Sequence, residues 1–398
     1  MILGCGGIYT PPRDTLLSRR VMIVAGEASG DIYGADLVRE ALLLNPELKF
    51  FGIGGNRMRK AGVLTLVDSA DMAVMGLVEV LKHFAVISSA FFKLKELLLK
   101  DPPDLLILID YPGFNLRLAK VAKKAGVKVL YYISPKVWAW KAGRLKTIAA
   151  TVNRMAVIFP FEVPLYEKAG VPVSFVGHPL LDLVHVNMRR EDAAASFGLD
   201  PSGKIIGLFP GSRRSEIERI LPDILAAAEL LQQRIPGLQF VLPLASTLRE
   251  DDILPHLKRT GLTPIITRQR IHDLIRACDA IISVSGTVTL EIALIGTPMV
   301  IIYKLAPVTY QVAKRLVRVE HVGLCNIVAG EAIVRELLQD NADPEKIAAE
   351  IRTILEDPGY EAAMRQKLAA IQGKLGGGGA SRNVAMLADQ LVRQRREI

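Results

Sequence analysis

Short apolar runs alternate with longer amphipathic segments along the chain from about residue 21. Runs of four to seven apolar residues bounded by Gly, Pro, Ser or Asp are typical of strands buried on both faces of a parallel sheet. The clearest predicted strands are 21–25, 105–109, 127–133, 155–159, 204–209, 239–243, 280–283 and 299–303. Helix-like segments lie between and after them, so the pattern predicts an α/β fold with doubly wound sheets.

The chain is long enough for two domains, because 398 residues exceed what a single core ordinarily supports. A polar stretch rich in Arg, Asp and Gly over 185–203 marks the predicted boundary. We expect two Rossmann-like domains, 21–185 and 186–375, that face each other across a cleft. Residues 1–20 form a lead-in, and a helix in 376–398 is expected to pack back on the first domain.

The composition is that of a globular protein, with 50% apolar and 23% charged residues. A net charge of +9 and a pI near 9.4 favour an anionic partner such as a nucleic acid, a nucleotide or an anionic membrane surface. The basic residues are scattered and are not interleaved with aromatic residues, which argues against nucleic acid. No apolar run reaches the ~18 residues of a membrane span, so we expect a protein that is soluble or lies on a membrane surface.

Metal and disulfide chemistry find little support in the sequence. The three cysteines are far apart and lack metal-ligand spacing, which favours a reducing compartment. No Asp-x-Asp pair occurs, so a divalent metal has no evident ligands. The first twenty residues contain no long apolar core and do not resemble a signal peptide.

Polar turns follow two predicted strands of the first half. Strand 21–25 runs into 26–31 (GEASGD), and strand 105–109 ends in Asp110. Ligands of open α/β sheets bind beyond the carboxyl ends of the strands, which favours a site here. The glycine spacing is not Gly-x-Gly-x-x-Gly, so a nicotinamide cofactor is not supported. Simpler interpretations stay open: the glycines make only a tight turn, Asp110 is a turn or N-cap residue, and His178 either faces the cleft or packs in a turn.

In the second half of the chain, the turn after the first predicted strand is suited to binding a phosphate group. Strand 204–209 leads into Gly211, Ser212 and Arg213, which open a helix. An arginine at this place can make a charge-assisted phosphate contact. Arg213 as a solvated residue of the helix surface is the alternative.

A second phosphate-sized turn follows the strand 280–283. Residues 285–291 (SGTVTLE) form a hydroxyl-rich turn and then a helix with Glu291 about one turn in. The free N–H groups and positive dipole end of a helix N-terminus suit a diphosphate, and Glu291 could reach a ribose diol. In the alternative interpretation, Ser285 and Thr287 only cap the helix.

Residues 71–100 combine a wide apolar arc with charges that are nearly all basic. Helices that face a core look like this. A helix at a membrane interface, or at the mouth of an acyl-chain site, has the same combination, and the pattern alone leaves both interpretations open.

Several of these stretches together resemble the lipid-A-disaccharide synthase family, which consists of inverting glycosyltransferases of the two-domain GT-B type. The matching motifs are 26–31, 52–55 with Met58, 74–81, 110–115, 134–140, 177–179, 209–214, 285–291 and 326–330. Each motif alone is weak, but their collinear order from about residue 21 to 340 is specific. Two departures are Asn56, where a proline is expected, and residues 1–20, which lie outside the resemblance.

The resemblance implies that a glucosamine unit is transferred from UDP-2,3-diacylglucosamine to 2,3-diacylglucosamine 1-phosphate. The products would be a β-1,6-linked disaccharide and UDP, made in lipid A biosynthesis. Because the sequence has no Asp-x-Asp pair, we expect no metal or other cofactor. The enzyme would be peripheral, on the cytoplasmic face of the inner membrane of a Gram-negative bacterium. A homodimer is compatible with the sequence, because the glycine-rich break at 375–380 would permit exchange of the last helix between protomers.

Residue roles follow from the resemblance and from the positions above. Inversion needs one base to take the proton from the acceptor hydroxyl. We predict Asp110 for this role, with Glu27 and Ser29 on the same side of the cleft, and Glu27 or Asp31 as open alternatives for the base. The predicted donor-binding residues are Gly211, Ser212, Arg213, Ser285, Gly286, Thr287, Thr289, Glu291 and Asn326. The predicted acyl-chain or membrane contacts are Met72, Val74, Met75, Leu77, Val78, Val80 and Leu81.

Three other functions stay as alternatives. A UDP-N-acetylglucosamine 2-epimerase also has two α/β domains with such a donor pocket, but it needs neither an acceptor nor an apolar 71–100 segment. A non-catalytic nucleotide-sugar binding protein would bind UDP and be indifferent to Asp110→Asn. A peripheral membrane scaffold would bind lipid but not UDP.

Overall fold

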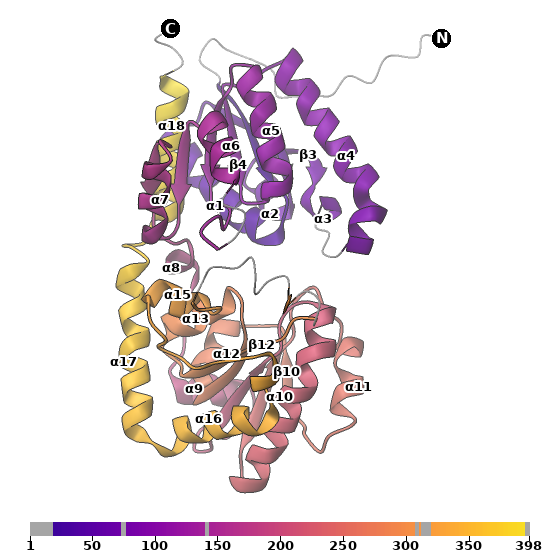
Figure 1. Ribbon diagram of the computed structural model, residues 1–398, viewed down its shortest axis with the longest axis vertical. Helices are drawn as coiled ribbons and strands as arrows, with labels where there is room; N and C mark the ends of the chain where they lie inside the picture. The colour runs from indigo at the N-terminus through magenta and orange to yellow at the C-terminus, as the bar shows by residue number, and fades with distance from the viewer. Residues whose placement is uncertain (1–18, 73–76, 140–142, 307–309, 312–319, 395–398) are drawn as a thin grey trace. The chain divides into compact units, whose positions relative to one another are not determined.

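The structure is a computed structural model that describes residues 19–72, 77–139, 143–306, 310–311 and 320–394, with only the backbone over 77–84. These residues form two compact units (Figure 1). The first comprises the described chain up to Pro179 and from Gly378 onward, and the second comprises Leu180–Gly377. The division falls between Pro179 and Leu180, upstream of the 185/186 boundary expected from the sequence.

The first unit is built on a seven-stranded parallel sheet in the order β3-β2-β1-β4-β5-β6-β7. Its strands are β1 (Arg19–Ala25), β2 (Leu48–Gly54), β3 (Leu64–Asp68), β4 (Leu105–Ile109), β5 (Lys128–Tyr132), β6 (Arg154–Val157) and β7 (Val173–Phe175). The central strand β4 is buried along its whole length, as a strand is when helices cover both faces of a sheet.

Helices connect the strands of the first unit, and one returns from the end of the chain. They are α1 (Ala28–Leu44), α2 (Asn56–Lys60), α3 (Ser69–Met72), α4 (Leu77–Lys100), α5 (Pro112–Lys124), α6 (Arg144–Thr151), η1 (Pro160–Glu162), α7 (Val163–Lys168) and α18 (Ala380–Arg393). The last of these, α18, packs against α1, β4 and β5 (Figure 1). Its inner face, which includes Val384 and Ala388, is fully buried, so the C-terminal helix is part of the core of the first unit.

The second unit repeats the plan with a six-stranded parallel sheet in the order β10-β9-β8-β11-β12-β13. Its strands are β8 (Ile205–Phe209), β9 (Gln239–Pro243), β10 (Ile265–Thr267), β11 (Ala280–Val284), β12 (Met299–Tyr303) and β13 (Glu336–Leu338). Its helices are α8 (Leu180–Leu183), α9 (Arg190–Ser196), α10 (Arg214–Arg234), η2 (Glu250–Asp252), α11 (Leu254–Leu257), α12 (Ile271–Ala277), α13 (Val288–Ile295), α15 (Leu324–Ala329), η3 (Gln339–Asn341), α16 (Pro344–Glu356) and α17 (Pro358–Lys374).

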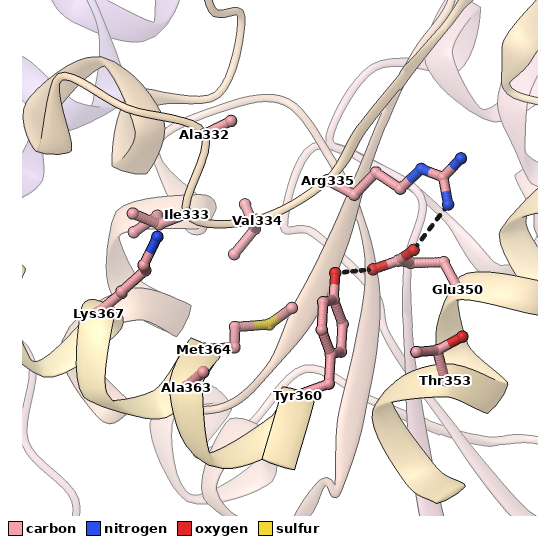
Figure 2. A pocket seen from close by; sticks show the side chains of 10 residues that line it. All are labelled: Ala332, Ile333, Val334, Arg335, Glu350, Thr353, Tyr360, Ala363, Met364 and Lys367. Carbon is pink, nitrogen blue, oxygen red and sulfur yellow. Dashed lines mark hydrogen bonds and ion pairs between the residues drawn. The ribbon is translucent and has the colours of Figure 1, made fainter. Parts of the chain in front are cut away.

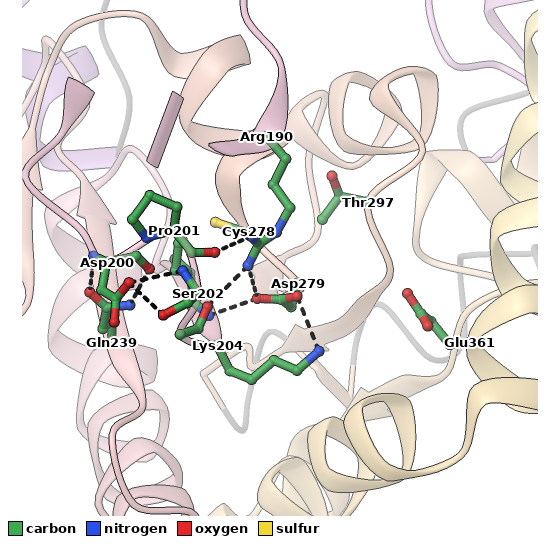
Figure 3. A network of polar contacts seen from close by, with 12 residues as sticks. Arg190, Asp200, Pro201, Ser202, Lys204, Gln239, Cys278, Asp279, Thr297 and Glu361 are labelled. Carbon is green, nitrogen blue, oxygen red and sulfur yellow. Dashed lines mark hydrogen bonds and ion pairs between the residues drawn. The ribbon is translucent and has the colours of Figure 1, made fainter. Parts of the chain in front are cut away.

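A polar network occupies the amino-terminal edge of the second sheet (Figure 3). Asp279, just before β11, accepts hydrogen bonds from Arg190 of α9 and from the amide of Ile205, both at 2.8 Å. Arg190 also donates to the carbonyl oxygens of Pro201 (2.7 Å) and Gly203 (3.1 Å). These contacts fasten α9 and the following turn to the amino-terminal edge of the sheet.

Each sheet reverses its strand order once, between β1 and β4 in the first unit and between β8 and β11 in the second. The register pairs Ala25 with Ile109, and Phe209 with Ser283. Doubly wound sheets bind ligands at such a reversal, beyond the carboxyl ends of the strands. The loops that leave these four strands are the ones that carry most of the predicted catalytic and donor-binding residues.

Candidate active site

Asp110 occupies the first position after β4, in an unusual backbone conformation. Its φ is 44° and that of Tyr111 is 46°, a left-handed region that residues other than glycine rarely adopt. The carbonyl oxygen of Asp110 accepts hydrogen bonds from the Tyr131 hydroxyl (2.6 Å) and the Asn115 amide (2.7 Å). These two bonds hold the strained turn, and they thereby set the direction in which the Asp110 side chain leaves the sheet.

The pKa of the Asp110 carboxyl group suits a general base. Burial raises its pKa from 3.8 to about 6, and the negative charge of Glu27 adds to this rise. The cations Lys136 and Arg144 lower the pKa. A carboxylate with a pKa just below neutrality is deprotonated at pH 7 and yet more basic than an ordinary aspartate, which suits proton abstraction.

Glu27 and Ser29 lie beside this turn, at the start of α1. Since Ala25 pairs with Ile109, the residues that follow β1 and β4 leave the sheet at the same edge. Glu27 precedes the helix and makes no capping hydrogen bond with its side chain, and Ser29 is exposed. The structure therefore brings the three residues predicted for catalysis to one edge of the first sheet.

Asp31, the third candidate for the base, has a different environment. Its Oδ1 accepts hydrogen bonds from the backbone amides of Gly55 (2.7 Å) and Met58 (3.0 Å), and its Oδ2 accepts one from the backbone amide of Arg57 (3.0 Å). The side chain is buried and caps the N-terminus of α2. Both oxygens are engaged, so Asp31 has a structural role and is not placed to take a proton from a substrate.

Two further ionisable groups are buried near the ends of β5, β6 and β7. Glu162 accepts a hydrogen bond from the amide of Phe159 (3.2 Å), and burial raises its pKa from 4.5 to about 7. His178 lies against the ring of Phe159, with 5.2 Å between the ring centroids, and burial lowers its pKa to about 4. Of the two interpretations of His178, a residue that faces the cleft or one that packs in a turn, its burial against Phe159 favours the second. Glu162 was not predicted, because a lone glutamate after a strand carries no recognisable pattern.

The residues predicted to contact acyl chains fall at the start of α4 and before it. Met72 is fully buried in the core of the first unit. Val74 and Met75 lie outside the described residues, as do the side chains of Leu77, Val78, Val80 and Leu81. Farther along α4, Phe92 and Leu99 are 62% and 52% exposed, and their spacing of about two helical turns puts them on one face. In the part of the chain that the structure describes, no helix is both long and apolar enough to cross a membrane.

The turn after β8 lies where the sequence predicts it. Two of the amides expected to bind a phosphate, however, donate hydrogen bonds to a carboxylate of the chain itself. Glu216 of α10 accepts hydrogen bonds from the amides of Ser212 (2.9 Å) and Arg213 (3.1 Å), and it pairs with the Arg213 guanidinium at 3.2 Å. Gly211 has a φ of 107°, and a Cβ there would meet this carboxylate. A carboxylate therefore sits where the prediction puts diphosphate oxygens. Glu216 follows Arg213 by three residues, which is the spacing of a capping box. This spacing was the signal in the sequence that Glu216 would bind these amides.

The turn after β11 combines exposed and buried polar groups. The Ser285 hydroxyl donates to the carbonyl oxygen of Val322 (2.9 Å), which ties the turn to the segment before α15. The Thr289 side chain, predicted to bind the donor, is buried and donates to the carbonyl oxygen of Gly286 (2.8 Å). Thr289 thus stabilises the first turn of α13. Thr287 is exposed at the helix N-terminus and keeps the position expected for a phosphate contact.

Glu291, in the first turn of α13, is paired with a histidine that the sequence analysis did not single out. Nε2 of His272 lies 3.2 Å from Oε2 of Glu291, and Nδ1 of His272 accepts a hydrogen bond from the amide of His185 at 3.3 Å. The two side chains are 26% and 23% exposed. The Glu291 carboxylate raises the pKa of the imidazole.

Asn326, also predicted to contact the donor, is fully buried. Its Nδ2 donates to the carbonyl oxygen of Val334 and to Glu336, both at 2.8 Å. Its Oδ1 accepts hydrogen bonds from the amides of Ile333 (3.0 Å) and Val334 (3.1 Å). The amide fastens α15 to β13 and keeps no hydrogen-bonding group for a ligand. A sequence motif shows that a residue is polar but not whether it is buried, so the structural role of Asn326 could not be predicted from the sequence.

A cavity of about 480 Å³ opens elsewhere in the second unit (Figure 2). It is lined by Ala332, Ile333, Val334, Arg335, Glu350, Thr353, Tyr360, Ala363, Met364 and Lys367. Inside it, Glu350 accepts hydrogen bonds from Tyr360 (2.6 Å) and Arg335 (3.0 Å). None of the predicted site residues lines this cavity. Among the described residues, no group of three or more His, Cys, Asp or Glu side chains is placed to hold a metal ion.

Comparison with known sequences identifies one family. A family described as Lipid-A-disaccharide synthetase matches residues 21–377. The lipid-A-disaccharide synthase of Trichlorobacter lovleyi is 69% identical over 376 residues, which cover 94% of this chain and 98% of that protein. The enzyme of the same name from Geobacter sulfurreducens is 63% identical, with the same coverage of 94% and 98%.

Solved structures share the fold at low sequence identity. The UDP-GlcNAc 2-epimerase from Neisseria meningitidis, solved with UDP-GlcNAc bound, has a TM-score of 0.65 at 15% identity and covers 93% of this chain and 100% of its own. Acinetobacter baumannii MurG has a TM-score of 0.56 at 15% identity, with 94% and 99% covered. Likeness at this identity concerns the fold alone. With the two parallel sheets, it confirms the predicted α/β class of the GT-B type.

Proposed function

The chain belongs to the lipid-A-disaccharide synthase family, and on this premise we propose that it joins UDP-2,3-diacylglucosamine to 2,3-diacylglucosamine 1-phosphate. Membership makes it a glycosyltransferase of lipid A biosynthesis. The two substrates and the inversion at the anomeric carbon are our proposal. The products are then a β-1,6-linked disaccharide 1-phosphate and UDP.

Asp110 acts as the general base in this mechanism. It takes the proton from the acceptor 6-hydroxyl while that oxygen attacks the anomeric carbon and UDP leaves from the opposite face, so one displacement inverts the centre. The observation that carries the assignment is the Asp110 carboxyl group itself, held at the end of β4 by a strained turn and with its pKa raised to about 6. Glu27 and Ser29 shape the acceptor side of the same edge.

The second unit holds the donor. The developing charge on the diphosphate is met by Arg213, by the amides around Gly211 and Ser212 and by the N-terminus of α13, without a metal ion. The diphosphate replaces the Glu216 carboxylate, which occupies the amides of Ser212 and Arg213 as an internal anion. Glu291 holds the ribose.

Both proposed substrates carry acyl chains, so the reaction takes place at a membrane surface, and the resemblance implies the cytoplasmic face of the inner membrane. Two features support a surface that meets anionic lipid. Phe92 and Leu99 are exposed on α4, with the ammonium group of Lys95 5.9 Å from the Phe92 ring centroid, and the chain carries a net charge of +9. Cationic side chains beside exposed apolar ones are typical of interfacial helices.

The test is an assay of UDP release by purified protein in mixed micelles that contain both substrates and EDTA. Release should require the acceptor and persist in the chelator. In Asp110→Asn it should fall by ~10²-fold or more, as expected for the loss of a general base. Asp251→Asn, at an exposed position of η2, is the matched control and should retain wild-type turnover.

Release that needs no acceptor would contradict the synthase reaction and favour an epimerase-like activity. Loss of activity in EDTA that added Mg²⁺ restores would contradict the metal-free mechanism. Full activity of Asp110→Asn would remove Asp110 as the base.

A further inference from the structure

The pairing of Glu291 with His272 is held from two sides. His272 lies in the first turn of α12, and α12 packs against α13, which carries Glu291. The next residue, Asp273, accepts a hydrogen bond from the amide of Asn187 (2.9 Å), and the amide of His185 donates to His272 itself (3.3 Å). The segment 185–187 therefore fixes the start of α12 and the plane of the imidazole ring.

The hydrogen bonds also define the tautomer of His272. A backbone amide can only donate, so Nδ1 accepts from His185 and carries no proton in this arrangement. The proton of the neutral ring is then on Nε2, which faces Oε2 of Glu291 at 3.2 Å. The imidazole is thus a donor with a fixed direction toward the carboxylate.

A carboxylate held in this orientation can accept hydrogen bonds from the two hydroxyl groups of a diol. One oxygen of Glu291 is bound to His272, which restricts rotation of the carboxylate, and the other oxygen can accept hydrogen bonds from ribose hydroxyls. The Glu291 side chain is 23% exposed, so it reaches solvent at the edge where the loop after β11 opens. Side chains whose orientation is fixed in advance lose less entropy on binding.

We propose that His272 is a positioning residue for donor recognition: anchored by the His185 amide, it orients Glu291 toward the ribose diol of the uridine nucleotide. The inference rests on the proposed function, because it takes Glu291 as the ribose ligand. It adds a residue that touches Glu291 and not the reacting atoms.

The test compares UDP with 2′,3′-dideoxyuridine diphosphate, which lacks both ribose hydroxyls, by calorimetric titration of the full chain. The ratio of the two dissociation constants measures recognition of the diol. Wild type should prefer UDP by ~10-fold or more, because hydrogen bonds to a charged group are strong. Glu291→Gln and His272→Ala should both reduce the preference to about threefold or less.

Two further variants separate positioning from folding. His272→Gln should restore most of the preference, since its side-chain amide can donate to Glu291 from near the place of Nε2. His256→Ala, on α11 and outside the site, should behave as wild type.

A wild-type preference in His272→Ala, together with its loss in Glu291→Gln, would overturn the role of His272. So would an equal weakening of both ligands in His272→Ala, or failure of His272→Gln to restore the preference. Equal binding of both ligands by wild type would show that Glu291 does not read the diol, while the UDP-release assay would still decide the proposed function independently. No binding of UDP by wild type would overturn both.

Discussion

Asp110 obtains its chemistry from its surroundings. At the level of single residues, the sequence places it at the end of an apolar strand, but many aspartates at such positions only start a turn. Its burial and the neighbouring Glu27 charge, which together raise its pKa to about 6, come from the pairing of β1 with β4. Asp31 has a different environment, because both of its oxygens accept hydrogen bonds from amides at the start of α2.

The acidity of Asp110 predicts a pH dependence. A base is active when deprotonated, so kcat/KM should rise with pH and level off above about 6, the pKa of Asp110. Glu27→Gln removes a negative charge that raises this pKa, so the midpoint should move to lower pH. It should stay above the ordinary value of 3.8, because burial is the larger cause. Initial rates of UDP release at substrate concentrations below KM, followed from about pH 4 to 8, measure this.

The matched control for this shift is Glu40→Gln, which removes a charge farther along α1. Its midpoint should equal that of wild type. A midpoint that stays in place in Glu27→Gln, or moves upward, would contradict the electrostatic coupling of Glu27 to Asp110.

At the level of elements, α2 is a short helix that depends on a cap from elsewhere in the chain. Asp31 satisfies the amides of Gly55, Arg57 and Met58, so Asp31→Ala leaves buried donors without a partner. We expect a loss of about 1–3 kcal/mol in the free energy of unfolding, measured by urea denaturation. Turnover per folded molecule should fall far less than in Asp110→Asn.

Asp36→Ala is the control. It removes an ion pair with Arg39 of the same helix, and because such pairs near the surface contribute little, stability should change by less than about 0.5 kcal/mol. A loss of turnover in Asp31→Ala as large as that of Asp110→Asn, in protein that is still folded, would return Asp31 to the list of candidate bases.

At the level of the whole molecule, α18 ties the end of the chain to the first unit. Val384 of α18 is fully buried, whereas Met386, two positions on, is 53% exposed. Val384→Asp should destabilise the first unit by ~3 kcal/mol or more, because it puts a charge into an apolar contact. Met386→Asp should have little effect.

Hydrogen exchange measures where the destabilisation acts. In Val384→Asp, peptides from β1, β4 and α1 should exchange faster, and those from β8 and β11 should keep wild-type protection. Equal acceleration in both units, or equal effects of the two substitutions, would contradict the assignment of α18 to the core of the first unit.

The sequence alone determined the elements whose information is local. Buried parallel strands such as 105–109 and 280–283 are continuous apolar runs, and the polar turns that follow them mark the carboxyl edge of each sheet. The family could be identified as well, because its motifs lie in order along the chain. The edge strands β3 and β13 were not predicted. The apolar residues of β3 are interrupted by Thr65, and β13 is only three residues long and begins with Glu336, so neither forms a continuous apolar run.

Only the tertiary structure decided what each polar residue of those turns contacts. Asp31 meets amides 24 to 27 positions away, and Glu291 meets His272 from a different helix. Thr289 and Asn326 are buried, although their motifs suggested a ligand contact. Hydrogen-bond partners and burial arise from the packing of segments that are distant in sequence, and a local pattern contains no record of that packing.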